Sequence, residues 1–563
     1  MGALRVDVDK FGGKTASVAK PIDYESAGSM TIVRDIVKTK IKEGKKVVMV
    51  ISAFSKTTDY LVGLEEMIRA GEIVDENQVK GYLNEFVRKP HEKLANDLNI
   101  PLKSTINMGF NPVYNEVVES ANALIRSKNK FSSSDSMLGV YSPMPFMMAF
   151  LSYLEKRNTS IDRIVQEFDI MKEYIGARDH LVTAGERMIL PFYKNFMNHR
   201  RSRLIRGTEA ITIPAEKIFY TDGKYGSANI DTNLSLGRVK GALLPALMDN
   251  SVKVVIVPGF YGATKGGSIT CFGRGGSDLT AVALAYFLSL IPEIKVEGPC
   301  LTKDTNGIMV VNPKEIYSTT NKEKGNIPST DVPLVPYTGI PQIDNLNYSD
   351  AMEIEAVHAG AVQFANKHGM TINIKKISDY FGSKASTISG NKTTSGYKLI
   401  GGTKDSILFE TRGTFKDEPG ESYWFGSILY KYGINVSKFM HYIGDTILVL
   451  DRGNERLPQA MGEMEKYMPI GLKECSLVRA SGDVLASDRT DFENIGSMLG
   501  AHVLSPFVRG YNTLSTAIPK FPERDGIDFY RAALTAYYDM WYDKQMEHTR
   551  KIITKLRNTF LKG

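Results

Sequence analysis

Cysteine is scarce in this chain of 563 residues, and no long apolar segment occurs. The three cysteines, Cys271, Cys300 and Cys475, lie far apart without the spacing of metal ligands, which argues against a disulfide framework or a zinc site. So few cysteines are typical of a reducing environment. No apolar run approaches the ~20 residues of a membrane span, and the N-terminal residues lack the pattern of a targeting peptide. We therefore expect a cytoplasmic protein without membrane contact.

The chain also lacks a clustered basic stripe. Its net charge of +7 is modest, and its hydrophobic and charged fractions of 42% and 24% are ordinary for a globular protein. This charge suits anionic small molecules, and we expect no nucleic-acid partner. The length exceeds what one hydrophobic core organises, so we expect several domains.

The first half of the chain has the pattern of an α/β fold. An alternating segment at residues 4–8 and apolar runs at residues 45–54 and 252–257 predict strands. Helical patterns at residues 29–42 and 59–69 lie between them. Alternating strands and helices favour a mainly parallel sheet, in which ligands bind at the carboxyl ends of the strands.

Two other regions differ from this pattern. Residues from about 90 to 175 predict an added helical subdomain. After about residue 400, the pattern predicts strands at 406–411, 434–443, 446–451 and 473–479, with helices at 424–432 and 457–467. This βαββαβ order is that of a ferredoxin-like module. Residues 491–527 suit part of a second copy, and residues from 528 onward predict a long helix.

A glycine-rich segment precedes a strongly apolar helical pattern that begins near Leu279. This segment, Arg-Gly-Gly-Ser-Asp at residues 274–278, combines a cation, glycines that permit close approach, and a helix start. Such a combination suits an anion. Simple helix capping by Ser277 and Asp278 is the alternative, and the residue types alone leave both interpretations open.

A second glycine turn follows Lys10. Residues 12–15, Gly-Gly-Lys-Thr, resemble the end of a Walker A loop, but Val8 occupies the position of its required first glycine, so the match fails. Residues 273–278 likewise miss the spacing of the dinucleotide-binding fingerprint. Lys10 is then either a surface charge or, beside the other glycine-rich loop, a phosphate ligand.

Four sequence blocks in a fixed order carry a family resemblance. They are KFGG at 10–13, VISAFSKTTDYL at 50–61, TAGER at 183–187, and VPGFYGAT with FGRGGSDLTAVALA at 257–285. These blocks resemble the aspartate kinases, which belong to the amino-acid kinase family. The resemblance implies an α/β three-layer αβα sandwich with a mainly parallel central sheet, followed by ferredoxin-like ACT regulatory domains. We expect a catalytic domain over 1–395 with its helical insert at about 90–175, an ACT domain over 396–485, and a divergent ACT-like region with the C-terminal helix over 486–563.

The resemblance implies transfer of the γ-phosphoryl group of ATP, with Mg²⁺, to the side-chain carboxylate of L-aspartate. The product is 4-phospho-L-aspartate, the first step of lysine, threonine and methionine biosynthesis in this family. A carboxylate with a pKa of about 3.9 is already ionised at neutral pH, so no strong base is needed. Catalysis would rest on positioning and positive charge, which fits the absence of an obvious histidine-based site from the sequence.

The resemblance also assigns roles to residues. Lys10, Arg274 and Asp278 are implied as catalytic: the lysine steadies the transferred group, the arginine pairs with a substrate carboxylate, and the aspartate orients the lysine or the shell of the metal. The implied substrate-binding residues are Ser52, Thr58, Glu186, Arg274, Gly276 and Ser277, and the implied nucleotide-binding residues are Lys10, Gly12, Gly13, Lys303, Asp304, Met309 and Lys314. No residue is assigned as a direct metal ligand.

Glu186 is implied to bind the α-amino group of the substrate. Without the resemblance, Ser52 and Thr58 would be interpreted as turn hydroxyls and Glu186 as a helix-start carboxylate.

The chain departs from the family pattern at several positions. Its first glycine loop is two residues longer, and Ile189, Met309 and Lys314 replace a usual serine, tyrosine and arginine. Val362 occupies the place of a lysine that binds nucleotide phosphates in the family. We hypothesise that Lys14, in the longer loop, supplies the missing charge. Two alternatives to an aspartate kinase remain: a kinase acting on another carboxylate or a carbamate, and a non-catalytic amino-acid sensor.

ACT domains imply regulation by an amino acid, with lysine or threonine as the effector and a homodimer or homotetramer formed through these domains. The candidate effector residues are Tyr423, Trp424, Phe425, Gly426, Asn435 and Val436. Packing of Trp424 and Phe425 in the core of the ACT domain is an equally good interpretation.

Overall fold

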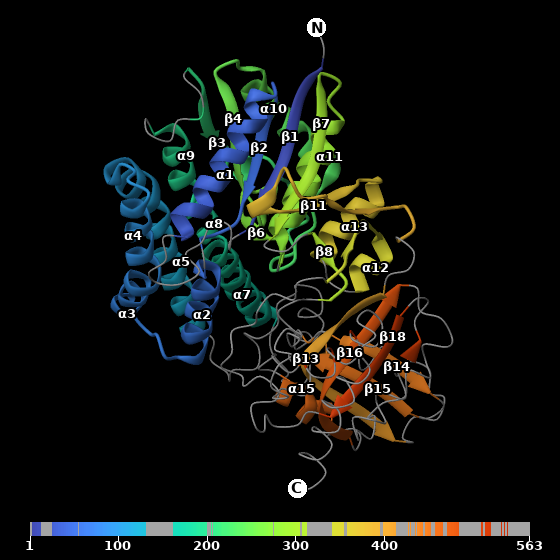
Figure 1. Ribbon diagram of the computed structural model, residues 1–563. Helices are drawn as coiled ribbons and strands as arrows, with labels where there is room; N and C mark the ends of the chain where they lie inside the picture. The colour runs from blue at the N-terminus through green and yellow to red at the C-terminus, as the bar shows by residue number, and fades with distance from the viewer. Residues whose placement is uncertain are drawn as a thin grey trace, which may run out of the picture. The chain divides into compact units, whose positions relative to one another are not determined.

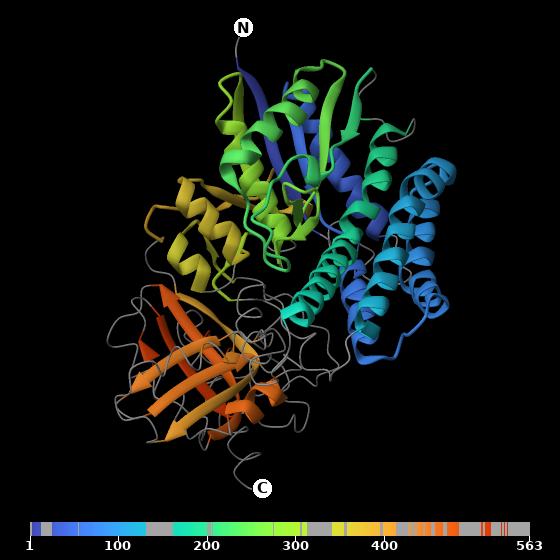
Figure 2. The same ribbon diagram turned by 180° about the vertical axis from the view of Figure 1, so that it is seen from behind.

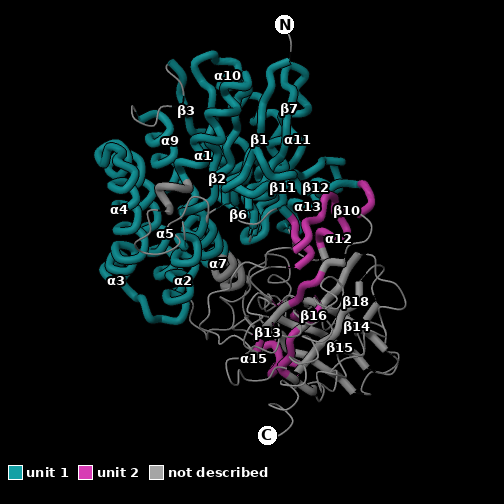
Figure 3. The backbone as a smooth tube through the Cα atoms, in the orientation of Figure 1, with its two compact units in different colours: residues 1–307, 357–390 teal, residues 308–356, 391–563 magenta. Residues whose placement is uncertain are grey.

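The chain forms two compact units, residues 1–307 with 357–390 and residues 308–356 with 391–563 (Figure 3). A computed structural model describes residues 3–12, 25–54, 56–130, 161–199, 204, 207–273, 275–303, 307–311, 340–353, 357–393, 398–412, 426, 428–429, 434, 436–442, 445–451, 457–464, 470–482, 508–509, 513–519, 531, 534 and 538. Each unit is described by itself below.

The first unit is built on a mainly parallel sheet. Its strands include β1 (Leu4–Phe11), β2 (Lys46–Ile51), β3 (Glu209–Thr212), β4 (Val252–Pro258), β7 (Ile294–Lys303), β11 (Ile372–Lys376) and β12 (Ser386–Ser389). Within the unit they lie in the order β12-β11-β7-β1-β2-β4-β3, and only β11 and β12 pair antiparallel. The apolar runs predicted as buried strands are β2 and β4, each paired with a strand on both sides, and every residue of β2 is buried.

Helices cover both faces of the sheet, so the predicted three-layer sandwich is confirmed. On one face α1 (Glu25–Lys42) packs on β2, and α9 (Leu190–Asn198) packs on β3 and β4 (Figure 1). On the other face lie α10 (Thr232–Met248) and α11 (Gly276–Ser289), with α13 (Ala359–His368) packed on α11 (Figure 2). A short hairpin, β5 (Tyr261–Ala263) and β6 (Ile269–Cys271), precedes α11.

A largely helical part of the first unit lies beside this sandwich. It comprises α2 (Thr57–Ala70), α3 (Glu76–Leu83), η1 (Asn84–Arg88), α4 (Lys89–Asp97), η2 (Lys103–Phe110), α5 (Asn111–Lys130), α7 (Ile161–Val182) and α8 (Ala184–Met188). The short helices η3 (Ala215–Lys217) and η4 (Ile377–Asp379) complete the unit as described.

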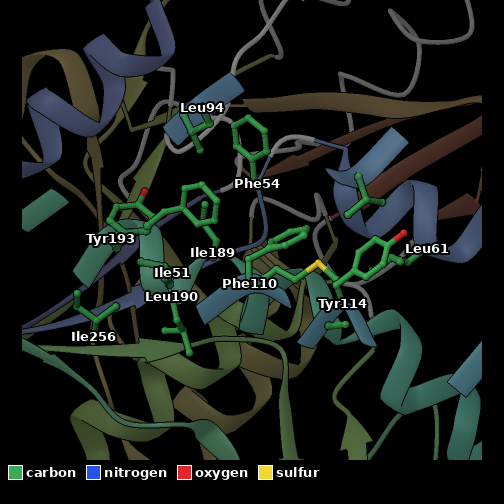
Figure 4. Packing of buried hydrophobic residues seen from close by; sticks show 14 of the residues in the cluster. Ile51, Phe54, Leu61, Leu94, Phe110, Tyr114, Ile189, Leu190, Tyr193 and Ile256 are labelled. Carbon is green, nitrogen blue, oxygen red and sulfur yellow. The ribbon is translucent and has the colours of Figure 1, made fainter. Parts of the chain in front are cut away.

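An aromatic cluster joins the helical part to the sheet. The ring of His91, on α4, lies 5.0 Å from Phe54, 4.9 Å from Phe110 and 5.4 Å from Phe192 between ring centroids. Burial lowers the pKa of His91 to about 4, so the ring is neutral and packs as an apolar group. Phe54 follows β2 directly, and Figure 4 shows it among Leu94, Phe110 and Ile189. The helices thus support the loop at the carboxyl end of β2.

The second unit contains an antiparallel sheet. Its strands are β13 (Lys398–Arg412), β14 (Val436–Tyr442), β15 (Asp445–Asp451), β16 (Ile470–Gly482), β17 (Val508–Arg509) and β18 (Thr513–Pro519), in the order β14-β15-β13-β16-β18-β17. Helix α15 (Leu457–Met464) connects β15 and β16. The order of the first four strands is that of the predicted ferredoxin-like module. The unit also includes β8 (Ile308–Met309), β9 (Gln342–Ile343), β10 (Asn345–Asn347) and α12 (Tyr348–Glu353). Across the described ranges of both units, no helix combines the length and the hydropathy needed to cross a membrane.

We predict that Phe110→Ala destabilises the first unit by about 3–5 kcal/mol, because the fully buried ring leaves a cavity beside His91 and Phe192. Met108→Ala is the matched control on the same short helix η2, since Met108 is 71% exposed. Chemical denaturation followed by far-ultraviolet circular dichroism measures both. Equal losses in the two variants would contradict the packing described here.

Candidate active site

The candidate site lies where four parallel strands end. Neighbouring strand ends are linked by hydrogen bonds: Ser52 N donates to Phe11 O at 3.3 Å, and Gly259 N donates to Ile51 O at 2.9 Å. Beside them, the hydroxyl of Thr302 on β7 donates to the carbonyl oxygen of Lys10 at 2.9 Å. These bonds bring the carboxyl ends of β1, β2, β4 and β7 together, as expected for ligand binding in a parallel sheet.

Two lysines from adjacent strands meet one carboxylate at this edge. Lys10 Nζ lies 2.7 Å from Asp278 Oδ1, and Lys303 Nζ lies 3.8 Å from Asp278 Oδ2. Burial alone would raise the pKa of Asp278, but the two ammonium groups outweigh it and hold that pKa below its ordinary value. Two ammonium groups thus meet one carboxylate at this edge. The side chain of Lys303 is 31% exposed, so its ammonium group is accessible to an anion.

Asp278 is placed by the first turn of α11. The helix begins at Gly276, slightly earlier than the apolar pattern predicts, so Ser277 and Asp278 belong to its first turn. Gly275 precedes the helix with φ +76°, and a Cβ there would lie 2.7 Å from the ring of His358. A side chain is therefore excluded at Gly275 by both backbone conformation and space.

Gly259 has a similar role at the end of β4. A Cβ at Gly259 would lie 2.5 Å from the Cβ of Ser277 and 2.7 Å from its Cα. The glycine thus permits contact between the strand end and the first turn of α11. His358, at the start of α13, is half-buried, and burial lowers its pKa, so it adds no positive charge at neutral pH.

Glu186 lies at the end of the neighbouring strand β2. Its Oε1 accepts hydrogen bonds from Ala53 N at 3.4 Å and from the hydroxyl of Thr58 at 3.5 Å. Its Oε2 is buried and has no hydrogen-bond partner among the described residues. Burial raises the pKa of Glu186 to about 8. A buried carboxyl group with an unused oxygen is suited to receive a cationic donor.

Close packing positions this carboxyl group. Gly185 approaches the loop after β2 so closely that a Cβ would lie 2.9 Å from the Cβ of Ala53. The next residue but one, Arg187, pairs with Glu116 of α5 and donates to the carbonyl oxygen of His180 at 2.9 Å. Sequence reasoning missed this anchoring role of Arg187, although the residue belongs to the TAGER block.

Asp179 is a second supporting residue that sequence reasoning missed. It is fully buried on α7, and one oxygen accepts hydrogen bonds from Gly226 N at 2.8 Å and Cys271 N at 2.9 Å. Cys271 ends β6, just before the glycine-rich loop. Burial raises the pKa of Asp179. Nothing in the local sequence indicates these partners, because Asp179 and Cys271 are 92 residues apart.

A sequence model of the amino acid kinase family matches residues 8–323, which include more than half of the chain and all of the strand ends described above. The chain belongs to that family.

Curated proteins that match part of this chain include aspartokinases. An aspartokinase of Bacillus sp. (strain MGA3) is 27% identical over 203 residues, which are 35% of this chain and 40% of the relative. One from Thermus thermophilus is 29% identical over 165 residues, 28% of this chain and 32% of the relative. The matched regions thus span well under half of these relatives.

A solved structure resembles nearly the whole chain. Aspartokinase III of E. coli, in complex with aspartate and ADP, superposes with a TM-score of 0.61, covering 99% of this chain and 100% of its own. The sequence identity is 17%, so the likeness establishes the fold. It covers the kinase fold and the ferredoxin-like sheet together.

Several predicted site residues lie outside the described residues: Gly13, Lys14, Arg274, Asp304, Lys314, Tyr423, Trp424, Phe425 and Asn435. Met309 lies on β8, Gly426 is exposed, and Val436 begins β14, all in the second unit. Val362 is fully buried on α13. Among the described residues, no group of three or more His, Cys, Asp or Glu side chains could hold a metal ion.

We expect Glu186→Gln to change how the free energy of unfolding depends on pH. The folded parent keeps the Glu186 proton up to pH of about 8, whereas the unfolded chain loses it near 4.5. The parent therefore loses stability through this group as the pH rises between these values. The glutamine does not titrate, so the variant gains roughly 3–5 kcal/mol relative to the parent across the window.

Denaturant unfolding at pH 5 and pH 8, about the limits of that window, measures this difference. Glu72→Gln, which replaces an exposed glutamate, should follow the parent. Parallel pH profiles for the parent and Glu186→Gln would show that the buried carboxyl group is ionised in the folded protein.

Proposed function

We propose that this protein is an aspartate kinase, which transfers the γ-phosphoryl group of ATP to the side-chain carboxylate of L-aspartate and forms 4-phospho-L-aspartate. The observation that carries the proposal is the pair Lys10 and Lys303 on Asp278, one strand away from the buried carboxyl group of Glu186. The first feature suits a polyphosphate, and the second suits an ammonium group.

The reaction needs positive charge rather than a base. The substrate carboxylate is ionised at neutral pH, so its oxygen attacks the γ-phosphorus directly while the bond from that phosphorus to the ADP oxygen breaks. Lys10 and Lys303 stabilise the phosphoryl oxygens during this transfer. Asp278 orients Lys10, with which it makes the shorter contact. Fixed charges of this kind stabilise the transition state without reorganisation.

The amino acid binds at the end of β2. Glu186 receives the α-ammonium group through its unused oxygen, and Ser52 and Thr58 line the same pocket. Arg274 pairs with a carboxylate of the substrate. Gly276 and Ser277 help by presenting the start of α11.

The nucleotide binds beside the lysines. Gly12 and Gly13 allow the phosphates to approach the end of β1, and Lys303 with Asp304 contacts the nucleotide from the end of β7. Mg²⁺ bound with the nucleotide would neutralise part of the phosphate charge. Because Asp278 already faces two lysines, the ion fits best as part of MgATP, held by phosphates and water.

Known relatives support this assignment. The relatives named above are aspartokinases, and the similar E. coli enzyme was solved with aspartate and ADP. A second structure of that enzyme, described as the T-state, contains lysine and aspartate and has a TM-score of 0.61. We therefore propose feedback by lysine or threonine through the ferredoxin-like unit, in a homodimer or homotetramer, at the start of lysine, threonine and methionine biosynthesis. The proposed effector residues are Tyr423 to Gly426, Asn435 and Val436.

One observation favours a second candidate. Val362 is fully buried, so this position brings no charge to the phosphates. A chain without that lysine could serve as a non-catalytic amino-acid sensor or act on another carboxylate. The assay below separates these outcomes.

We predict that the purified protein forms aspartyl hydroxamate from MgATP, L-aspartate and hydroxylamine, which traps the acyl phosphate. L-Glutamate should give no product, and lysine or threonine should suppress the reaction. Lys10→Met should lower kcat by about 100-fold or more, because it removes a charge at the transferred group.

The control for charge removal is Lys217→Met, since Lys217 is exposed on η3 and should leave kcat unchanged. ATP binding without product from aspartate or glutamate would point to another substrate. Absence of both product and ATP binding would favour the sensor.

We also predict that kcat/KM for aspartate rises with pH up to about 8, by up to about tenfold per pH unit, because Glu186 must lose its proton to bind the ammonium group. In Glu186→Gln, kcat/KM for aspartate should be low and independent of pH between about pH 6 and 8, the range set by this pKa. KM for ATP should be unchanged. Steady-state rates across this range measure the effect. A flat profile for the parent would remove Glu186 from the amino-acid site.

A further inference from the structure

Two aspartates are buried on the strand that carries Lys10. Asp9 is fully buried and Asp7 is 3% exposed. Helices α1 and α11 lie on opposite faces of the sheet (Figure 1). Side chains alternate along a strand, and accordingly Lys10 contacts Asp278 of α11, while Asp7 and Asp9 contact Lys40 of α1. A central strand of a parallel sheet ordinarily presents apolar residues on both faces. These two charges are therefore costly and require a specific environment.

Lys40 of α1 supplies that environment. Its ammonium group lies 2.7 Å from Asp7 Oδ2 and 2.6 Å from Asp9 Oδ2. The hydroxyl of Tyr380, just after η4, accepts a hydrogen bond from Lys40 at 2.8 Å and donates one to Asp9 Oδ1 at 2.8 Å. Lys40 and Tyr380 are themselves buried. Strand β1, helix α1 and the segment after β11 are thus joined by buried polar contacts.

The contacts continue to the surface through further ion pairs. Lys45 lies 3.5 Å from Asp7 and 2.7 Å from Glu297 of β7, and Arg5 lies 2.7 Å from Glu297. Lys45 also contacts the exposed side chain of Glu43 at 3.1 Å. Inside this rim, the acids Asp7, Asp9 and Glu297 face the bases Lys40, Lys45 and Arg5. We refer to these six residues with Tyr380 as the β1 charge network.

The network spans an irregularity in the sheet. Asp7 pairs with Glu297 in the β1–β7 register, but Asp9 pairs with Cys300, so β7 has one extra residue between these pairs. Glu297 and Asp7 lie on one side of this bulge, and Asp9 lies on the other. Lys10, opposite Leu301, is the next residue beyond it. A bulge interrupts the ladder of backbone hydrogen bonds, so the ladder alone holds the register less firmly here.

We propose that the β1 charge network sets the register of β1 on β7 across this bulge and thereby places Lys10 against Asp278 and beside Lys303. The seven residues are positioning residues, because they lie on the face of the sheet opposite Lys10 and act through the strand. The proposal rests on the proposed function for its kinetic consequence, but its structural consequence is independent of it.

A role in stability alone would not require these charges. Buried ion pairs can be replaced by apolar residues of similar volume with little or no loss of stability, whereas removal of one partner is destabilising. Phosphoryl transfer is sensitive to small displacements of the charged groups that surround it. Replacing all of the buried charges together therefore separates stability from positioning.

The test compares the parent with the triple variant Asp7→Val, Asp9→Val and Lys40→Met, in the full-length chain. We expect its melting temperature to equal or exceed that of the parent, while kcat falls by about tenfold or more. KM for L-aspartate should stay within about twofold, because Glu186, on α8, lies against the end of another strand, β2. A crystal structure of the variant should show Lys10 Nζ withdrawn from Asp278.

A matched pair of tyrosine variants provides the control. Tyr380→Phe removes two hydrogen bonds from the network and should lower kcat several-fold. Tyr174→Phe removes a comparable buried bond, of 2.6 Å to Glu65, far from β1 in the sequence, and should leave kcat unchanged.

Each outcome decides the proposal. The proposal would be overturned if the triple variant had the kcat of the parent. It would also be overturned if the crystal structure of the variant kept residue 9 opposite Cys300 and Lys10 at 2.7 Å from Asp278. A parent without kinase activity would contradict the proposed function, and the crystal structure would still decide whether the network sets the register. A triple variant that fails to fold leaves Tyr380→Phe against Tyr174→Phe to decide, with equal kcat values overturning the proposal.

Discussion

The sharing of one buried carboxylate by two lysines is the constraint on which this site depends. Asp278 is 6% exposed at its side chain, and a carboxylate so deeply buried must be paired or protonated. Lys10 and Lys303 keep it ionised from two adjacent strands, β1 and β7. Because the pair must meet the first turn of α11, the ends of both strands and the start of the helix are fixed relative to one another. Gly259 and Gly275 are the positions where this convergence leaves no room for a side chain.

The second feature of the site is the buried carboxyl group of Glu186, whose pKa shifts in the direction opposite to that of Asp278. Glu186 has no lysine beside it among the described residues, so desolvation dominates and raises its pKa, whereas Asp278 is held ionised by its neighbours. Two carboxyl groups that lie against neighbouring strand ends thus differ in charge because their partners differ. The lysines beside Asp278 suit an anion, and the unused oxygen of Glu186 suits an ammonium group. In the function proposed above, this separation lets one site hold a polyphosphate and an amino acid at once.

The sequence predicts the parts of this arrangement that depend on local patterns. Strands β2 and β4 correspond to continuously apolar runs, and α11 corresponds to the apolar helical repeat that begins near Leu279. The sequence blocks shared with the family predict site roles for Lys10, Glu186 and Asp278. Their supports could not be predicted, since Asp179 and Cys271, or Lys40 and Tyr380, are distant in sequence and share no pattern. The apolar repeat begins near Leu279 and α11 begins at Gly276, because glycines contribute nothing to an apolar repeat.

Asp7 and Asp9 show most clearly what the sequence pattern cannot predict. Alternation of Leu4, Val6 and Val8 predicts a strand, and by the same alternation Asp7 and Asp9 would lie on a solvated face. The face is instead covered by α1, and Lys40 from that helix contacts both carboxylates. Alternation of apolar and polar residues along a strand indicates that its two faces differ, but it does not indicate what covers the polar face. Only a side chain from elsewhere in the chain converts such a face into a buried layer, and here that layer lies directly behind the lysine on which the proposed chemistry depends.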